Sequence, residues 1–247
     1  MKLLAMDTST LVMSVAVLDV KEQKVLGEVT TNLHKNHSIR LMPTIDQLLQ
    51  DLDLTIQDIA LLAVTSGPGS YTGLRIGITT AKTMAWARNI PLYSVSSLSV
   101  LARNAVHFKG VIVPIFDARR ERAYTGAYRF HNRELKAVLP EQVVGVDAWL
   151  SQLKELDEPI LFLGDDVVRF RSKIEQTLGD QAIGGSPYEN IPRASVLGES
   201  AYRRWLNHQP AERINFAPNY LQVTEAEANW LKKQKNGENR DESAIER

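Results

Sequence analysis

Residues 60–88 read ALLAVTSGPGSYTGLRIGITTAKTMAWAR, and this stretch decides the fold class. Its first six residues form a continuous apolar run, which predicts a buried strand. The glycine-rich residues 67–73, called the glycine loop below, favour special backbone angles and side-chain caps. Residues 74–88 predict a helix. A strand, a glycine loop and a helix in this order form a βα unit, so the sequence indicates an α/β protein.

The same layout of strands occurs twice in the chain. Residues 3–6, 12–18 and 25–31 predict three hairpin-connected strands, and residues 111–116, 122–130 and 135–139 predict three more. In both sets the first strand is apolar and ends in an aspartate, Asp7 or Asp117. A meander that repeats and is followed each time by alternating helices and strands indicates internal duplication. We therefore expect the two-lobed, duplicated fold of actin-like ATPases, sugar kinases and Hsp70 (the ASKHA, RNase H-like fold).

The duplication also predicts the domain boundaries. We assign residues 1–106 to the first lobe and residues 107–215 to the second. Residues 216–233 predict a last helix that packs back on the first lobe. Residues 234–247 mix both charge signs and contain little apolar sequence, which predicts a disordered tail.

The composition excludes several classes of protein. Lys plus Arg and Asp plus Glu both number 29, so the chain lacks the basic excess of a general nucleic-acid binder. Any contact with RNA must be local or shared with a partner. No cysteine is present, which excludes disulfides and thiolate metal sites. No apolar stretch fits a signal peptide or a membrane span, so we expect a cytoplasmic protein without a membrane partner.

The turns after the two aspartates decide whether the chain works as an ATPase. In this fold such turns usually contain glycines, whose N–H groups wrap the phosphates of ATP. The turns here are Asp7-Thr8-Ser9-Thr10 and Asp117-Ala118-Arg119-Arg120, and neither contains a glycine. Asp7 and Asp117 are residual nucleotide-turn positions, or they only end strands and bond to their own turns. We therefore expect no catalytic residue, no metal and no cofactor of the chain's own.

The glycine loop leaves two interpretations open. The candidate residues are Gly67, Gly69, Ser70, Thr72 and Arg75. A helix N-terminus behind such a loop can bind an anion, but no Gly-Lys-Ser/Thr sequence completes a P-loop. The alternative is a tight connection between strand and helix that requires glycine.

Two helices supply candidate partner surfaces. Gly73, Gly77 and Ala81 form a stripe of small residues, which allows another backbone to approach closely. That backbone belongs either to the protein's own sheet or to a partner helix. Leu41, Ile45 and Leu48 line one face of an earlier helix and form the second candidate.

Several stretches resemble the bacterial TsaB (YeaZ) family. They are LLAMDTSTLVMSVAVLD (residues 3–19), HSIRLMPTIDQLL (37–49), VTSGPGSYTGLRIG (64–77) and VPIFDARRERAY (113–124). The resemblance covers residues 1–105 strongly, residues 113–124 clearly and the remainder of the chain weakly. TsaD, the catalytic relative, continues into a His-x-x-x-His metal motif, where this chain has Ser97 and Leu101. A hydroxyl and an isobutyl group cannot hold that metal.

The resemblance implies a scaffold subunit without a complete active site. Such a subunit belongs to the complex that forms N6-threonylcarbamoyladenosine at position 37 of tRNAs reading A-starting codons. Its expected partners are TsaD, the ATPase subunit TsaE and, through the complex, tRNA. When alone, the chain could pair with a second copy of itself. ATP and a metal are expected on the partner subunits.

Two other functions stay open. The chain could be an ATP-dependent phosphotransferase or peptidase of the same fold, which nucleotide affinity of the isolated chain would favour. It could also be a homodimeric regulator unrelated to tRNA, which unchanged modified nucleosides after depletion would favour.

Overall fold

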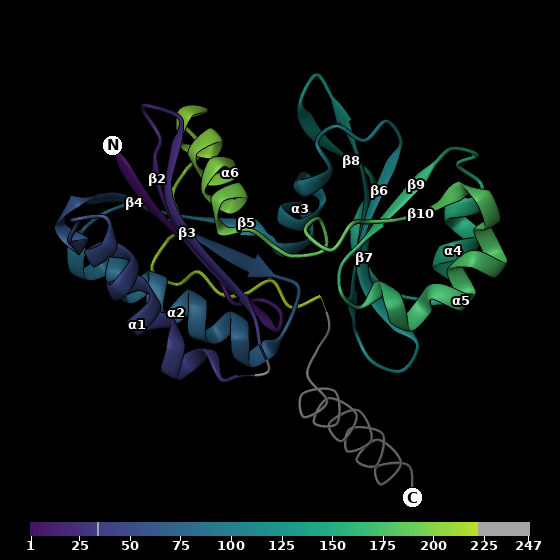
Figure 1. Cartoon of the computed structure of the whole chain (residues 1–247), viewed down its shortest axis with the longest axis horizontal. Coiled ribbons are helices and arrows are strands. Elements are labelled where there is room, and N and C mark those ends of the chain that lie inside the picture. Colours follow the sequence, from purple (N-terminus) through teal and green to yellow (C-terminus); the bar gives the residue numbers. More distant parts are fainter. Residues whose placement is uncertain (34, 222–247) are drawn as a thin grey trace, which may run out of the picture.

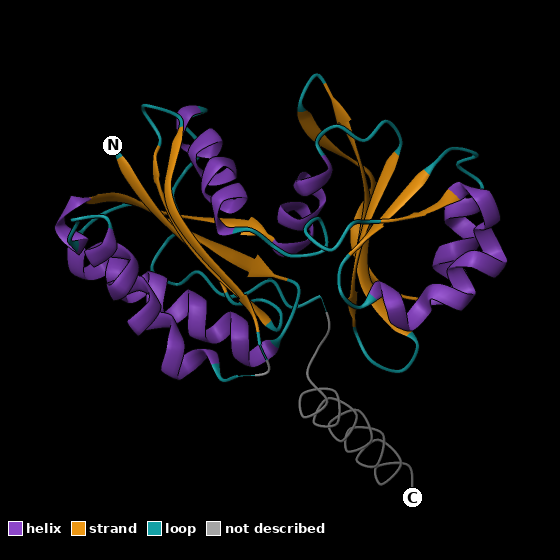
Figure 2. Ribbon diagram, in the orientation of Figure 1, coloured by secondary structure: helices purple, strands orange, loops and turns teal. Residues whose placement is uncertain are grey.

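The computed structural model describes residues 1–33 and 35–221, which form two lobes side by side (Figure 1). Each lobe has a five-stranded sheet between helices (Figure 2). The predicted tail and most of the predicted last helix lie outside the described residues. Within the described ranges, no helix is both long and apolar enough to cross a membrane.

The first sheet has the strand order β3-β2-β1-β4-β5. β1 pairs antiparallel with β2 and parallel with β4, and β4 pairs parallel with β5. The meander and the βα unit therefore share one sheet, as the sequence predicted. The strands are β1 (Lys2–Asp7), β2 (Val12–Asp19), β3 (Lys24–Asn32), β4 (Ile59–Gly67) and β5 (Leu92–Ser96).

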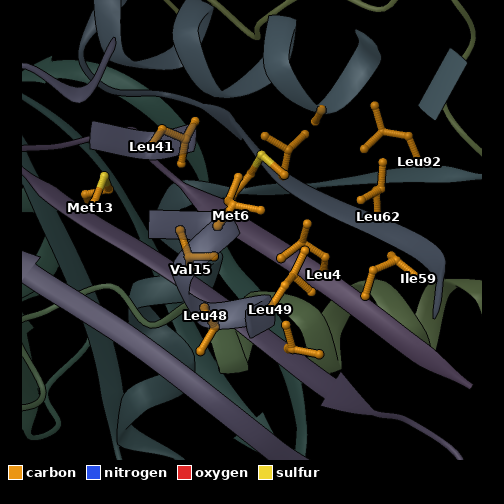
Figure 3. Close-up of a cluster of buried hydrophobic side chains, with 14 of the residues drawn as sticks. Leu4, Met6, Met13, Val15, Leu41, Leu48, Leu49, Ile59, Leu62 and Leu92 are labelled. Atoms are coloured by element: carbon orange, nitrogen blue, oxygen red, sulfur yellow. The ribbon is translucent and has the colours of Figure 1, made fainter. Parts of the chain in front are cut away.

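Two helices, α1 (His37–Asp51) and α2 (Tyr71–Arg88), cover one face of this sheet (Figure 1). Asn36 caps α1, because its side chain accepts the N–H of Ser38. The apolar face of α1 packs against alternate residues of the strands. The core between them includes Leu4, Met6, Val15, Leu41, Ile45, Leu48 and Leu62 (Figure 3).

The second sheet repeats the first. Its order, β10-β9-β6-β7-β8, is the same when read from the other edge, which confirms the duplication. The strands are β6 (Val111–Asp117), β7 (Arg122–His131), β8 (Glu134–Gly145), β9 (Ile160–Leu163) and β10 (Ala182–Gly184). α4 (Val146–Lys154) and α5 (Val167–Leu178) cover one face around the buried Trp149. β8 is longer than predicted, and β10 was not predicted.

The remaining α-helices connect the lobes, because α3 (Ser97–Ala102) packs on both sheets and α6 (Ala194–Leu206) packs on the first sheet although it follows the second. α3 precedes the second lobe but packs Leu98, Leu101 and Ala102 onto the second sheet. α6 packs Leu197 and Ala201 onto the first. The chain therefore returns to the first lobe at α6 rather than at residue 215. Short 3-10 helices lie at η1 (Ile56–Asp58), η2 (Arg103–Ala105) and η3 (Gly179–Gln181).

The segment after α6 stays with the first lobe. The Tyr93 hydroxyl donates to the carbonyl of Gln209 at 3.0 Å, and the N–H of Glu212 donates to the carbonyl of Leu92 at 2.8 Å. The N–H of Asn219 donates to the carbonyl of Ser66 at 2.7 Å. The chain returns to the first lobe from residue 194 onward. Residues 216–221, the described part of the predicted last helix, are not helical.

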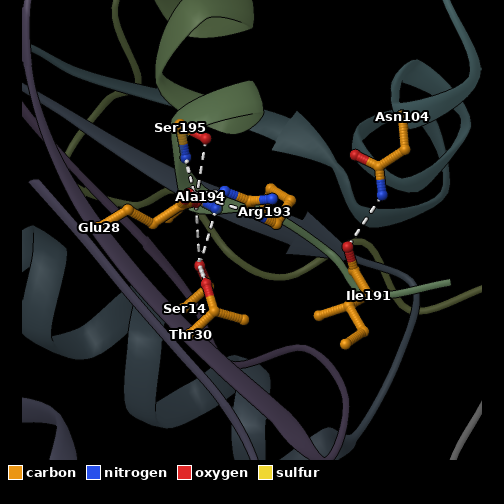
Figure 4. A network of polar contacts seen from close by, with 8 residues as sticks. All are labelled: Ser14, Glu28, Thr30, Asn104, Ile191, Arg193, Ala194 and Ser195. Atoms are coloured by element: carbon orange, nitrogen blue, oxygen red, sulfur yellow. Dashed lines mark hydrogen bonds and ion pairs between the residues drawn. The ribbon is translucent and has the colours of Figure 1, made fainter. Parts of the chain in front are cut away.

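A polar network fixes the start of α6 on the first sheet (Figure 4). Glu28 on β3 accepts the N–H and the hydroxyl of Ser195, both at 2.9 Å, and pairs with Arg193. The Ser14 hydroxyl accepts the N–H of Ala194 at 2.9 Å. Burial alone raises the pKa of Glu28, but these hydrogen bonds outweigh it, so the pKa lies below its usual value. A charged Glu28 therefore caps the helix from a neighbouring strand.

Candidate functional site

A cleft of about 750 Å³ lies between the lobes, where the turns after β1 and β6 face each other. Residues 9–12 and the glycine loop line it from the first lobe. Residues 116–119 and Asp165, Asp166 and Arg169 line it from the second. In this fold, the turns after the first strands bind the phosphates of ATP. The contents of the two turns therefore decide what the cleft can do.

The glycine loop packs directly on the first turn. The N–H of Ser70 donates to the carbonyl of Ser9 at 2.7 Å, and the Thr8 hydroxyl donates to the carbonyl of Gly73 at 2.7 Å. A Cβ on Gly69 would lie 2.1 Å from the Ser9 oxygen, and one on Gly73 would lie 2.0 Å from the Thr8 oxygen. The glycines are required because the two backbones touch. The backbone of the glycine loop thus fills the space on one side of the first turn.

Asp7 is enclosed beneath this contact. Its Oδ1 accepts the N–H of Ser9 at 2.8 Å and the hydroxyl of Thr65 at 2.9 Å. Burial raises the pKa of Asp7, and the hydrogen bonds from Ser9 and Thr65 and the nearby His37 offset only part of that shift. Asp7 is not among the residues that line the cleft. The geometry favours the second of our two interpretations, a carboxyl group that organises its own turn.

The second turn is occupied by ion pairs. Asp117 pairs with Arg169 and accepts the N–H of Arg119 at 2.9 Å, while its own N–H donates to Asp166 at 2.9 Å. Burial raises the pKa of Asp166 most, and the charge of Asp117 adds to that shift. Arg119, Arg120 and Glu121 have φ values of 68°, 54° and 55°, so three successive residues adopt the left-handed conformation. The arginines stand where the fold would need glycine N–H groups.

The remaining glycine-loop residues cap α2 and hold the returning chain. The Ser70 side chain accepts the N–H of Gly73 at 3.2 Å as the helix cap. Gly67 has φ 102°, and a Cβ there would lie 2.9 Å from the carbonyl of Asn219. The Arg75 guanidinium lies 4.2 Å from the centre of the Tyr71 ring and donates to the Tyr220 hydroxyl. Thr72 is exposed at the helix start. These contacts favour the connecting role over an anion site.

Comparison with known proteins identifies the family. The model for tRNA N6-adenosine threonylcarbamoyltransferase (TsaD) matches residues 20–230. The tRNA threonylcarbamoyladenosine biosynthesis protein TsaB of Bacillus subtilis is 45% identical over 235 residues, which cover 95% of this chain and 100% of that protein. The chain belongs to the TsaB (YeaZ) family.

More distant TsaB proteins and solved structures agree. TsaB of Haemophilus influenzae is 27% identical, and the match covers 93% of this chain and 96% of that protein. A crystal structure from Pseudomonas aeruginosa, described as similar to peptidase YEAZ, has a TM-score of 0.77 and 26% identity. The match covers 90% of this chain and 99% of the Pseudomonas aeruginosa chain. The predicted actin-like fold and the predicted family are both confirmed.

The partner-surface residues predicted from the sequence of this TsaB family member lie in its interior. Gly73, Gly77 and Ala81 are buried, and a Cβ on Gly77 would lie 2.4 Å from Thr8 Oγ1. Leu41, Ile45 and Leu48 are buried in the core of the first lobe. This prediction of a partner surface was wrong, because both stripes face the protein's own sheet. That alternative was left open for the glycine stripe.

The sequence analysis missed the outward faces of the same helices. Trp86 on α2 is 76% exposed, and Ile39 and Met42 on α1 are 71% and 48% exposed. They are out of phase with the buried stripes, and that signal could have identified them. Ser97 and Leu101, which stand at the TsaD metal positions, are fully buried. Among residues 1–33 and 35–221, no group of three His, Cys, Asp or Glu could hold a metal.

Asp7 allows a test of the structural role. Because its pKa is raised in the folded chain, its contribution to the unfolding free energy is fully present below about pH 4 and is lost as the pH rises through the raised pKa. An asparagine at this position still accepts the hydrogen bonds from the Ser9 N–H and the Thr65 hydroxyl, but it carries no negative charge. We expect Asp7→Asn to be at least as stable as the wild type at neutral pH, with the difference vanishing toward pH 4. Thermal unfolding across this range measures it.

The same Asn variant separates structural from catalytic roles in cells. It should support normal levels of threonylcarbamoyladenosine in tRNA when it replaces the wild-type chain. A folded Asp7→Asn protein that loses the modification would show that the carboxylate acts chemically.

Proposed function

We propose that this chain is the non-catalytic scaffold subunit of the complex that forms N6-threonylcarbamoyladenosine at position 37 of tRNAs reading A-starting codons. It acts by dimerising with the catalytic relative TsaD, and TsaE joins the complex. The names of its relatives support the pathway. The observation that carries the scaffold role is that neither turn contains a glycine and that Arg119, Arg120 and the Asp117–Arg169 ion pair occupy the second. In this role the chain is a structural subunit and not a catalytic one. ATP and a metal bind to the partner subunits.

The outward faces of α1 and α2 supply the surface for this partner. The two helices lie side by side on one face of the first sheet (Figure 1). Between α2 and residues 214–220 runs a groove of about 650 Å³, lined by Trp86, Ile214 and Phe216. Ile214 is 69% exposed, and among the described residues no acidic side chain lines the groove. Exposed aromatic and aliphatic side chains around a groove are typical of the centre of a protein interface. We therefore place the TsaD contact here.

Depletion of the protein tests the pathway. Nucleoside mass spectrometry of total tRNA should show that threonylcarbamoyladenosine falls to a small fraction of its normal level. Expression of this chain should restore it, whereas additional TsaD alone should not, because TsaD lacks its scaffold. Unchanged modification after complete depletion would contradict the proposal and favour a regulator unrelated to tRNA.

A further inference from the structure

One wall of the groove beside α2 is a segment that is neither helix nor strand. Residues 214–220, called the strap below, run along α2 (Figure 1). The Nζ of Lys82 donates to the carbonyl of Phe216 in this segment at 2.8 Å. At the end of the strap, the Tyr220 ring stacks on Tyr71 with the ring centres 5.1 Å apart. The strap is therefore fixed on α2 at two places.

The outward face of α2 forms the opposite wall. Its residues in the groove recur at intervals of three or four, so they share one face of the helix: Arg75, Thr79, Lys82 and Trp86. From the strap, every second residue lines the groove: Ile214, Phe216, Pro218 and Tyr220. The groove thus has largely apolar walls, and the charged side chains among its described lining residues are both cations.

Lys82 carries a positive charge that no carboxylate balances within residues 1–33 and 35–221. In these ranges its ammonium group has the hydrogen bond to the Phe216 carbonyl and no ion pair. An ammonium group has three N–H donors, so this bond leaves two donors and the whole charge for other groups. Lys82 is half-buried, and water solvates those donors while the groove is open.

A protein that covers the groove removes this water. A desolvated ammonium group is strongly unfavourable unless an anion pairs with it, so the covering surface must supply one. The same surface must be apolar to pack between Trp86 and Ile214. An Asp or Glu side chain within an otherwise apolar segment meets both requirements.

We propose that an apolar segment of TsaD occupies the groove and that an Asp or Glu carboxylate of this segment pairs with Lys82 Nζ. The inference rests on the proposed function, because it names the chemistry of the TsaD surface that binds there. Lys82 then joins three elements, since it lies on α2, holds the strap through Phe216 and binds the partner with its remaining donors. Such a pair fixes the orientation of the partner in the groove.

A charge series at Lys82 tests the ion pair, with isothermal titration calorimetry of the full chain and purified TsaD as the measurement. Lys82→Met keeps the length of the side chain but leaves the TsaD carboxylate buried without a partner, so Kd should rise by about 30-fold or more. Lys82→Arg keeps the charge and should bind more tightly than Lys82→Met. Lys82→Glu should bind more weakly than Lys82→Met, because it places a second carboxylate beside the first.

The same series separates the ion pair from the support of the strap. Methionine and glutamate both lose the hydrogen bond to the Phe216 carbonyl, so a role limited to the strap predicts equal affinities for these two variants. Cleavage by trypsin after the exposed Arg213, next to the strap, should accelerate equally in both. Lys136 is exposed on β8 of the second lobe, and Lys136→Met should bind TsaD like the wild type.

Carbodiimide cross-linking of the wild-type complex identifies the carboxylate. The reagent condenses an amine and a carboxylate that are in contact to an amide. Mass spectrometry should therefore find Lys82 joined to an Asp- or Glu-containing peptide of TsaD, whereas Lys136 should not be joined to TsaD.

Three results would overturn the inference and leave the proposed function intact. They are an unchanged Kd in Lys82→Met, an equal Kd in Lys82→Met and Lys82→Glu, and a Lys82 cross-link to a peptide of this chain. The last result would show that residues 222–247 or a second copy of the chain fills the groove. A wild-type chain that does not bind TsaD would overturn the proposed function as well.

Discussion

Replacing Trp86 by aspartate should weaken the heterodimer with TsaD by about 30-fold or more while the chain stays folded. Trp86 is 76% exposed and lines the groove between α2 and residues 214–220, so the substitution removes no core contact. Truncating an aromatic residue at the centre of an interface typically costs about 2–4 kcal/mol, and a buried carboxylate adds to that. Isothermal titration calorimetry of the two purified proteins measures the change directly.

The control for this variant is an equally exposed aromatic residue elsewhere. Tyr188 is 70% exposed in the second lobe, so Tyr188→Asp should leave both the affinity and the melting temperature unchanged. Ile39→Asp on α1 should act in the same direction as Trp86→Asp if the interface spans both helices. Normal affinity in both the Trp86 and the Ile39 variants would exclude the outward faces of α1 and α2, and the TsaD contact would then lie on another part of the chain.

Most of the fold could be predicted because its elements have strong local patterns. The apolar runs of β1 and β6 are each followed by an aspartate and two hairpin strands, and a repeat of this length is hard to produce by chance. β10 could not be predicted, since three residues are too few to show a period. The placement of α6 could not be predicted either. An amphipathic helix shows that it has an apolar face, but its sequence does not say which of two sheets that face covers.

The residues of the candidate site could be predicted from the sequence better than the contacts between them. The absence of glycine from both turns follows from the sequence, but whether residues 67–73 form an anion site or a tight connection that requires glycine stayed open. The contact that connects them, Ser70 to Ser9, joins residues far apart in the chain and has no sequence pattern. The stripe of Gly73, Gly77 and Ala81 showed that a backbone approaches closely, but it could not show whose backbone.

Gly77 supplies the second large expected effect, a loss of stability. A Cβ at this position would lie 2.4 Å from Thr8 Oγ1 and 3.6 Å from Val64 Cγ2, so the side chain of Gly77→Leu has no room. Overpacking costs about 1–3 kcal/mol, and displacing the Thr8 hydroxyl from the carbonyl of Gly73 costs about 1 kcal/mol more. The better helix propensity of leucine offsets about 0.8 kcal/mol. We expect a net loss of about 1–3 kcal/mol and a melting temperature lower by about 2–12 °C.

A double-mutant cycle shows whether Thr8 is the group that Gly77 must avoid. Gly77→Ala alone should destabilise the chain, because its Cβ already conflicts with Thr8 Oγ1. In a Thr8→Ala background that oxygen is gone, so the same substitution should cost less, and the difference is the coupling free energy of the pair. Ala87→Leu, on the exposed side of α2, should leave the melting temperature nearly unchanged. If Gly77→Leu instead melts like the wild type and loses only its affinity for TsaD, the stripe contacts the partner, and the close approach of α2 to the first turn is not what requires glycine there.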